Sequence, residues 1–90
     1  MGLDFQNMTP DILGLRTWRL SKGIALATIA QSTKLSIRLL EAIECGDFRK
    51  LPGGIYNTSY IRQYARAIEF DESELLRFYH HRQAQTVAAP

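Results

Sequence analysis

The chain has 90 residues, of which 46% are hydrophobic and 22% are charged, and its formal net charge is +2. This length fits one small domain, and the weak positive charge differs from that of proteins that contact many phosphates. The single cysteine, Cys45, cannot form an internal disulfide, which is typical of a reducing cytoplasm. The sequence has no apolar run of roughly 18 residues or more, so it predicts no membrane span.

The first predicted helix covers residues 10–22, after a flexible N-terminus over residues 1–8. Thr9 offers a capping hydroxyl, and a proline and an acidic residue follow at the first helical positions, where both are favourable. Gly23 should end the helix. The apolar positions that we expect to face the core are Ile12, Leu15 and Trp18.

Residues 26–46 form the centre of the predicted fold, with two short helices over residues 26–32 and 37–45 around a tight turn. Ser36 is a good N-cap for the second helix. Ala25 holds the same position before the first helix and has no side-chain acceptor, which should weaken that helix start by about 1 kcal/mol. The inward-facing positions are expected at Ile29, Leu35, Leu40 and Ile43. This layout indicates a helix-turn-helix unit, which can read DNA or bind protein.

Two further helices are predicted over residues 55–68 and 72–82, and residues 83–90 read as a tail or the start of a linker. Asp71, with an acidic residue three positions later, resembles a capping box at the start of the last helix. Core positions in this half are expected at Phe48, Leu51, Ile61, Ala65, Ile68, Leu75, Leu76 and Tyr79. The sequence therefore predicts an all-α domain of five helices over residues 9–82, with no strand.

Three motifs occur together in the second half: E-x-G-D-F at residues 44–48, L-P at residues 51–52 and Y-I-R-x-Y-A-R at residues 60–66. The helix order resembles that of lambda-repressor-like domains, and the motifs resemble the cytoplasmic N-terminal domain of RodZ, a family of bacterial cell-shape proteins. The resemblance covers residues 15–76. It implies a cytoplasmic protein-interaction domain whose partner is the actin-like filament protein MreB.

RodZ proteins continue through a basic segment into a membrane-spanning helix, and this sequence contains neither feature. The resemblance therefore implies either the cytoplasmic part of a membrane-anchored protein or a free-standing relative. The membrane tether is not carried over to these residues.

The helix over residues 55–68 carries the candidate protein-binding residues. At about 100° per residue, Tyr56 and Tyr60 lie away from its core face, and aromatic residues near arginines are typical of binding hot spots. The alternative is that the rings are buried at the rim of the core with only the hydroxyls in water. Tyr64 lies nearest the core direction, and we favour burial for it. The full candidate set is Tyr56, Tyr60, Arg62, Gln63, Tyr64 and Arg66.

Binding of double-stranded DNA is the alternative function. In DNA-reading relatives the first turns of the second helix of the unit contact base edges in the major groove. Arg38 suits that role, Ile37 could contact thymine methyl groups, and Glu41 brings unfavourable negative charge toward the phosphates. The candidate DNA-binding residues are Lys34, Ser36, Ile37, Arg38 and Glu41. This set favours protein binding over DNA binding.

One ion pair is expected inside the domain. In the repressor-like fold that the chain resembles, the positions of Arg19 and Glu44 face each other. Arg19 could contact a phosphate, but we favour a buried clamp with Glu44, whose loss would destabilise the fold.

No residue pattern indicates catalysis. Cys45 has no neighbouring base that would activate a thiol, and the adjacent His80 and His81 point about 100° apart, which does not suit metal chelation. The glycines at residues 53–54 lack the lysine of a phosphate-binding loop. We therefore expect no enzyme activity, no metal, no cofactor and no small-molecule substrate.

Overall fold

The computed structural model describes residues 10–88, which contain five α-helices, two 3-10 helices and no β-strand. The elements are η2 (Ile12–Gly14), α1 (Leu15–Ser21), α2 (Leu26–Thr33), α3 (Ile37–Cys45), η3 (Phe48–Lys50), α4 (Tyr56–Ala67) and α5 (Glu72–Ala88). The predicted all-α helix-turn-helix architecture is confirmed. No helix within the described range combines the length and the apolar character needed to cross a bilayer.

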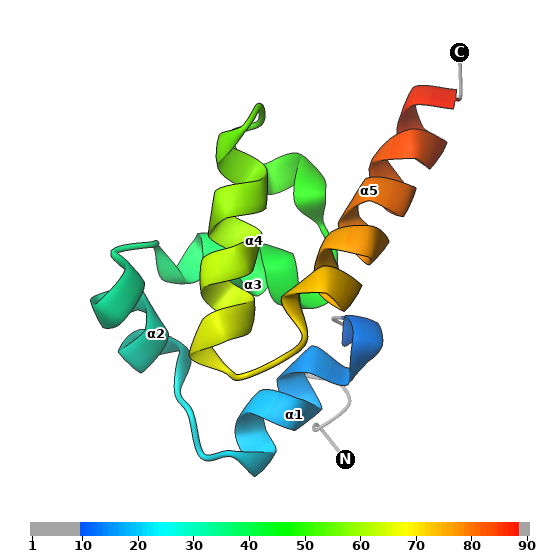
Figure 1. Cartoon of the computed structure of the whole chain (residues 1–90). Helices are drawn as coiled ribbons and strands as arrows, with labels where there is room; N and C mark the ends of the chain where they lie inside the picture. The colour runs from blue at the N-terminus through cyan, green and yellow to red at the C-terminus, as the bar shows by residue number, and fades with distance from the viewer. Residues whose placement is uncertain (1–9, 89–90) are drawn as a thin grey trace, which may run out of the picture.

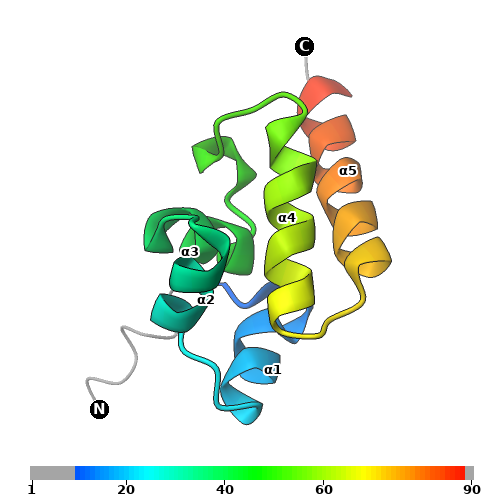
Figure 2. The same ribbon diagram turned by 60° about the vertical axis from the view of Figure 1, so that its left-hand side comes forward.

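Helix α4 lies at the centre of the arrangement (Figure 1 and Figure 2). Helix α5 packs along α4 and runs in the opposite direction. Helices α2 and α3 lie on the other side of α4, and α1 lies across the end where α4 finishes and α5 begins. The first turn of α4 therefore stands at the opposite end of the domain from α1.

The start of α1 differs from the prediction, because regular α-helix begins at Leu15 and not at Pro10. The carboxylate of Asp11 accepts hydrogen bonds from the backbone N–H groups of Arg16 and Thr17, at 2.6 and 3.3 Å. Between these partners the chain makes the short turn η2, in which φ of Leu13 is 54°. An aspartate side chain can thus replace the helical hydrogen bonds of a first turn. Residues 1–8 and the predicted cap Thr9 lie outside the described residues.

The residues at the ends of the helices in the helix-turn-helix unit act as predicted. The hydroxyl of Ser36 accepts a hydrogen bond from the N–H of Leu39 at 3.1 Å, whereas Ala25 makes no side-chain cap. Helix α3 ends at Gly46, where φ is 78° and a Cβ atom would lie 2.8 Å from Cγ2 of Ile12. Only glycine fits both this backbone conformation and this close contact.

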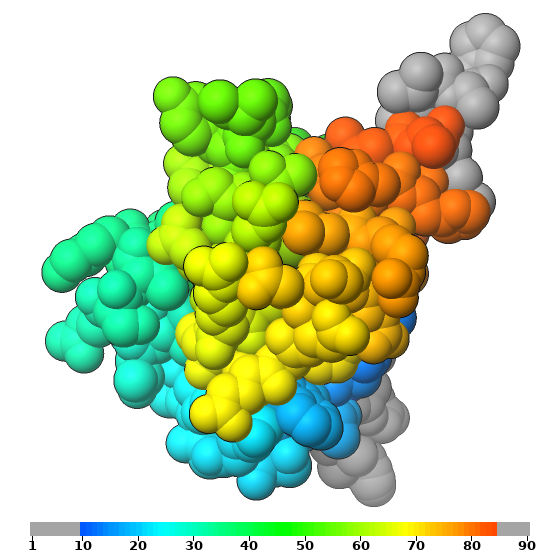
Figure 3. Space-filling view, viewed as in Figure 1, coloured from blue at the N-terminus to red at the C-terminus, as the bar shows by residue number. Residues whose placement is uncertain are grey.

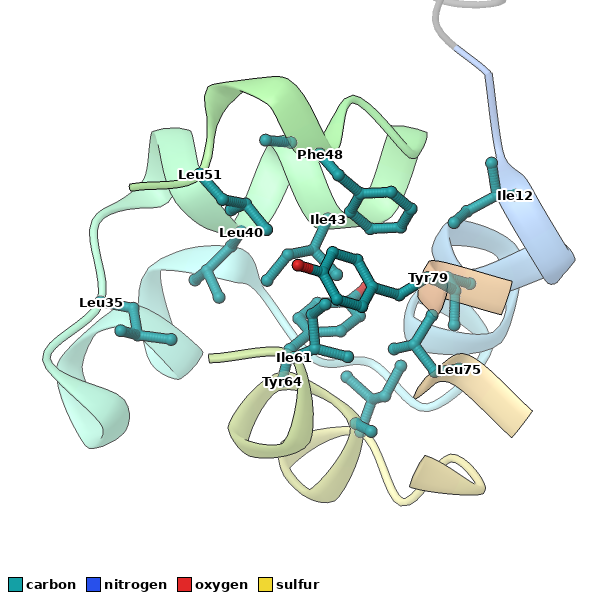
Figure 4. Packing of buried hydrophobic residues seen from close by; sticks show 14 of the residues in the cluster. Ile12, Leu35, Leu40, Ile43, Phe48, Leu51, Ile61, Tyr64, Leu75 and Tyr79 are labelled. Carbon is teal, nitrogen blue, oxygen red and sulfur yellow. The ribbon is translucent and has the colours of Figure 1, made fainter. Parts of the chain in front are cut away.

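The core is one cluster of buried apolar side chains that draws on all five α-helices (Figure 4). Its members are Ile12, Leu15, Ile29, Leu35, Leu40, Ala42, Ile43, Phe48, Leu51, Ile61, Tyr64, Ala65, Ile68, Leu75 and Tyr79. Burying one such large side chain contributes about 1.5–3 kcal/mol, so this cluster is the main source of stability. The predicted inward positions are confirmed except for Trp18 and Leu76, of which Leu76 is only partly buried.

Trp18 lies at the edge of the core and remains 41% exposed, so its predicted place in the interior is wrong. Its indole N–H donates a hydrogen bond of 2.7 Å to the carbonyl oxygen of Ile68, and its ring packs edge-on against Phe70. An indole has one polar atom that needs a partner, and here it finds one in the backbone at the end of α4. Trp18 therefore fastens α1 to the α4–α5 turn.

Helix α5 is longer than predicted and extends to Ala88 instead of ending at Arg82. The predicted tail over residues 83–90 is therefore helical through Ala88. Its start agrees with the prediction, because the carboxylate of Asp71 accepts hydrogen bonds from the N–H groups of Ser73 and Glu74, at 2.9 and 3.4 Å. These bonds satisfy backbone donors that a helix leaves unpaired in its first turn.

Candidate protein-binding surface on helix α4

The buried side-chain amide of Asn57 holds the loop before α4 in place. The side-chain oxygen of Asn57 accepts a hydrogen bond from the N–H of Gly53 at 2.8 Å, and its nitrogen donates to the hydroxyl of Tyr79 at 3.1 Å. Asn57 is only 3% exposed, so both bonds lie within the protein. The first turn of α4 is thereby tied to the preceding loop and to α5.

Tyr56 and Tyr60 form a stacked pair on one flank of α4. Their ring centroids are 6.4 Å apart and their planes differ by 22°. The Tyr56 side chain is 60% exposed, and Tyr60 is half-buried against the core cluster. Their predicted place outside the core face is confirmed for Tyr56 and holds partly for Tyr60. Their role in binding stays a prediction.

The arginines of the candidate set lie on the other flank of α4, toward the start of α5. Both approach the carboxylate of Glu72: Nε of Arg66 at 2.8 Å and Nε of Arg62 at 3.7 Å. The hydrogen bond with Arg66 lowers the pKa of Glu72 and raises the pKa of Arg66. The arginines are thus engaged within the domain, and they are not grouped with the tyrosine pair. Gln63 is half-buried and donates a hydrogen bond of 3.3 Å to the Ser59 hydroxyl.

Tyr64 does not belong to the surface. Its side chain is 0% exposed, and its hydroxyl donates a hydrogen bond of 2.6 Å to Oε2 of Glu44. Burial, followed by the nearby carboxylate of Glu44, raises the pKa of the Tyr64 hydroxyl well above its usual value. The burial that we favour for Tyr64 is confirmed, and its place among the binding candidates is wrong, because the core face of α4 extends far enough to enclose its ring.

The predicted clamp between Arg19 and Glu44 is present. Nε of Arg19 lies 2.5 Å from Oε2 of Glu44, and Nη1 of Arg19 donates to the carbonyl oxygen of Ile24 at 2.8 Å. The two residues are 7% and 2% exposed, and the hydrogen bond with Glu44 raises the pKa of Arg19. Nε of Arg16 approaches the same carboxylate at 3.6 Å. Sequence reasoning missed the third partner, Tyr64, although a tyrosine on a core face needs a partner for its hydroxyl.

Two of the candidate DNA-binding residues of α3, Arg38 and Glu41, line a groove of about 700 Å³ between α1 and α3. Arg38 shares this groove with the carboxylates of Glu41 and Glu44, so both signs of charge meet there. Ile37 is 43% exposed at the start of the helix, where a DNA reader needs polar groups. The five candidates Lys34, Ser36, Ile37, Arg38 and Glu41 are all exposed, but together they form no continuous basic surface.

Comparison with known proteins agrees with the helix-turn-helix fold. A family model described as a helix-turn-helix domain matches residues 14–75, and the chain belongs to that family. The chain is also 35% identical over 65 residues to the cytoskeleton protein RodZ of Streptococcus pneumoniae (strain ATCC BAA-255 / R6), an alignment that covers 72% of this chain. It is a RodZ-like helix-turn-helix domain, as the motifs suggested. The alignment spans 24% of that relative. No solved structure matches the chain.

Proposed function

We propose that this domain is a cytoplasmic protein-interaction module that binds an actin-like filament protein of the MreB type in bacterial cell-shape control. The observation that carries the proposal is the stacked pair of Tyr56 and Tyr60 on the flank of α4. Large aromatic rings held on a rigid helix offer much contact area for little loss of conformational entropy. The relative's name supports a cytoskeletal setting. We propose no enzymatic role.

The surroundings of the tyrosine pair fit this role. Tyr60 rests against the core while Tyr56 extends outward, so Tyr60 supports the ring of Tyr56 in its exposed position. A partner that covers the exposed ring of Tyr56 removes apolar surface from water, which favours binding. Exposed aromatic residues near the centre of an interface often dominate its affinity.

DNA binding is the less favoured function. Specific DNA readers gain affinity by neutralising phosphates, but Glu41 is exposed on α3, and Lys50 and Arg49 are both close to Asp47, at 3.7 and 3.4 Å. The exposed Ile37 offers no hydrogen bond to a base edge. A surface with this charge balance does not favour a long series of phosphate contacts.

Cosedimentation with polymerised MreB-type protein tests the proposal. We expect the wild-type domain to pellet with filaments and Tyr56→Ala to weaken the affinity roughly tenfold or more. Leu20→Ala is the matched control, because Leu20 is 60% exposed, like Tyr56, but lies on α1 at the other end of the domain. A wild-type domain that stays in the supernatant at all filament concentrations contradicts the proposal.

A gel shift at two salt concentrations tests the alternative. A DNA-binding domain would retard a duplex at low salt and lose it steeply as the salt concentration rises. We expect no retardation by this domain at either concentration. Sequence-dependent retardation that Arg38→Ala abolishes would favour the DNA-binding function instead.

A further inference from the structure

Helix α4 begins without the usual caps. Its N-cap position is Ile55, which provides no side-chain acceptor, and the described first turn contains no acidic residue. The first N–H groups of a helix lack helical partners, so an uncapped start is less stable than a capped one. This turn nevertheless carries Tyr56, the exposed ring of the proposed filament-binding surface. The segment that contains the start of α4, green in Figure 3, projects from the top of the molecule.

The loop before this turn is flexible by composition. Gly53 and Gly54 are adjacent, with φ values of 100° and 67°, and glycine loses more conformational freedom on folding than any other residue. The backbone N–H of Asn57 donates to the carbonyl oxygen of Gly54 at 3.3 Å. The Thr58 hydroxyl donates to the carbonyl oxygen of Ile55 at 3.0 Å. Both bonds are local, so neither attaches the loop to the rest of the domain.

The side chain of Asn57 supplies that attachment. Its amide accepts a hydrogen bond from the N–H of Gly53 and donates one to the hydroxyl of Tyr79 on α5, at 2.8 and 3.1 Å. An amide can accept and donate at once without bringing a charge into the interior. The Tyr79 ring packs edge-on against Phe48, with centroids 5.0 Å apart. The contacts of Asn57 therefore lead from the loop into the core.

We propose that Asn57 is a positioning residue of the filament-binding surface, because it holds the backbone from which Tyr56 extends. This inference rests on the proposed function and adds a buried residue that does not itself touch the filament. The ring of Tyr56 is stacked on that of Tyr60, but stacking orients a ring only while its backbone stays in place. Asn57 follows Tyr56 directly, so its two side-chain bonds fix the main chain at that point. A surface that is ordered before binding loses less conformational entropy when a partner covers it.

Cosedimentation of Asn57→Ala with MreB-type filaments tests the proposal, at a temperature at which melting curves show every variant folded. We expect the affinity to weaken roughly three- to tenfold. Tyr79→Phe removes the acceptor on α5 but keeps the bond to Gly53, so it should weaken the affinity less. Trp18→Phe is the matched control, because it removes a hydrogen bond that fastens the opposite end of α4. Its affinity should equal that of wild type.

A double-mutant cycle distinguishes positioning from a general loss of stability. If Asn57 acts through Tyr56, Asn57→Ala should change the affinity by less than about twofold in a Tyr56→Ala background. An equal loss of affinity in both backgrounds overturns the inference. If Asn57→Ala does not fold, Tyr79→Phe takes its place in the cycle.

Backbone relaxation measured by NMR gives a second readout, without the filament. The order parameter of the Tyr56 amide should fall from roughly 0.85 toward 0.6 in Asn57→Ala. It should stay at the wild-type value in Trp18→Phe. An order parameter that does not change in Asn57→Ala shows that the first turn of α4 is held by other contacts, and the inference fails.

The outcomes separate this inference from the proposed function. If Tyr56→Ala weakens binding but Asn57→Ala binds like wild type, the positioning role is overturned and the proposed function stands. If the wild-type domain does not cosediment, the proposed function fails. The role of Asn57 in filament binding then fails with it, whatever the order parameter of Tyr56.

Discussion

The hydroxyl of Tyr64 and the guanidinium of Arg19 both donate hydrogen bonds to the same oxygen of Glu44, so one buried carboxylate joins α1, α3 and α4. The carboxylate is 2% exposed, and its charge is balanced inside the domain by Arg19. Such a pair does not add much stability compared with an apolar core, but breaking it from one side is costly.

Arg19→Ala should destabilise the domain strongly, because the buried Glu44 carboxylate loses its closest counter-charge and keeps only the longer contact with Arg16, at 3.6 Å. We expect a loss of about 3–5 kcal/mol in the free energy of unfolding, measured by urea unfolding followed by circular dichroism. Arg66→Ala is the matched control, because it removes an arginine from the exposed pair with Glu72 and should cost less than about 1 kcal/mol. An unchanged melting temperature for Arg19→Ala would show that the clamp is not a structural element.

Tyr64→Phe tests the third member of the clamp. The substitution keeps the buried ring and removes only the hydroxyl that donates to Glu44, so the carboxylate loses one donor at a cost of about 1–3 kcal/mol. Tyr56→Phe removes a hydroxyl from a ring that is 60% exposed, and its unfolding curve should match wild type. Equal stability of the two variants would mean that the Tyr64 hydroxyl contributes nothing.

Gly46→Ala should destabilise the end of α3 through two effects. The residue has φ of 78°, and a Cβ atom there would lie 2.8 Å from Cγ2 of Ile12. Gly23→Ala has a similar φ of 70° but nothing within 4 Å of the new atom. In both variants alanine must adopt a left-handed backbone conformation, which costs roughly 1 kcal/mol of stability. Any further loss of stability in Gly46→Ala therefore measures the contact with Ile12. Thermal unfolding of both proteins would show whether that loss exists.

The stability of the domain should fall at acidic pH partly through Asp11. Burial alone would raise the pKa of Asp11, but hydrogen bonds from the Thr17 hydroxyl and from the N–H groups of Arg16 and Thr17 lower it below its usual value. A carboxylate with a lowered pKa in the folded state stabilises the protein above its unfolded pKa, about 4. That contribution to stability disappears as the pH falls through the pKa of Asp11 in the folded state.

Asp11→Asn is the variant that measures this effect, because an asparagine keeps the shape of the side chain but cannot titrate. The difference in melting temperature between wild type and Asp11→Asn should be largest near neutral pH and should shrink as the pH falls below about 4. A difference that is constant across the acidic range would exclude a role for the Asp11 charge in stability.

Local signals in the sequence were sufficient to locate the helix-turn-helix unit. Helix α3 runs from Ile37 to Cys45 as predicted, because a serine cap and a glycine stop act on their immediate neighbours. The start of α1 was misplaced since Asp11 can serve either in a first helical turn or as a side-chain acceptor for a later one. The end of α5 was placed too early. The sequence there has no stop signal, so it does not mark where the helix ends.

The candidate site was harder to predict than the fold. The exposure of Tyr56 and the burial of Tyr64 both follow from helical periodicity, but the hydrogen bond that Tyr64 donates to Glu44 joins residues that are distant in sequence. Trp18 was misplaced for a related reason, since its indole finds a partner at the end of α4 that local sequence does not reveal.

The shared carboxylate of Glu44 has a consequence for how this fold can be adapted. Its three partners, Arg19, Arg16 and Tyr64, join α1, α3 and α4 from inside the protein, and exposed residues such as Ile37 and Arg38 on α3 take no part in these contacts. The exposed positions of α3 could therefore be randomised to create new binding specificities, provided that Glu44 and its three partners are kept. The domain is, in this respect, a rigid frame with an exchangeable exterior.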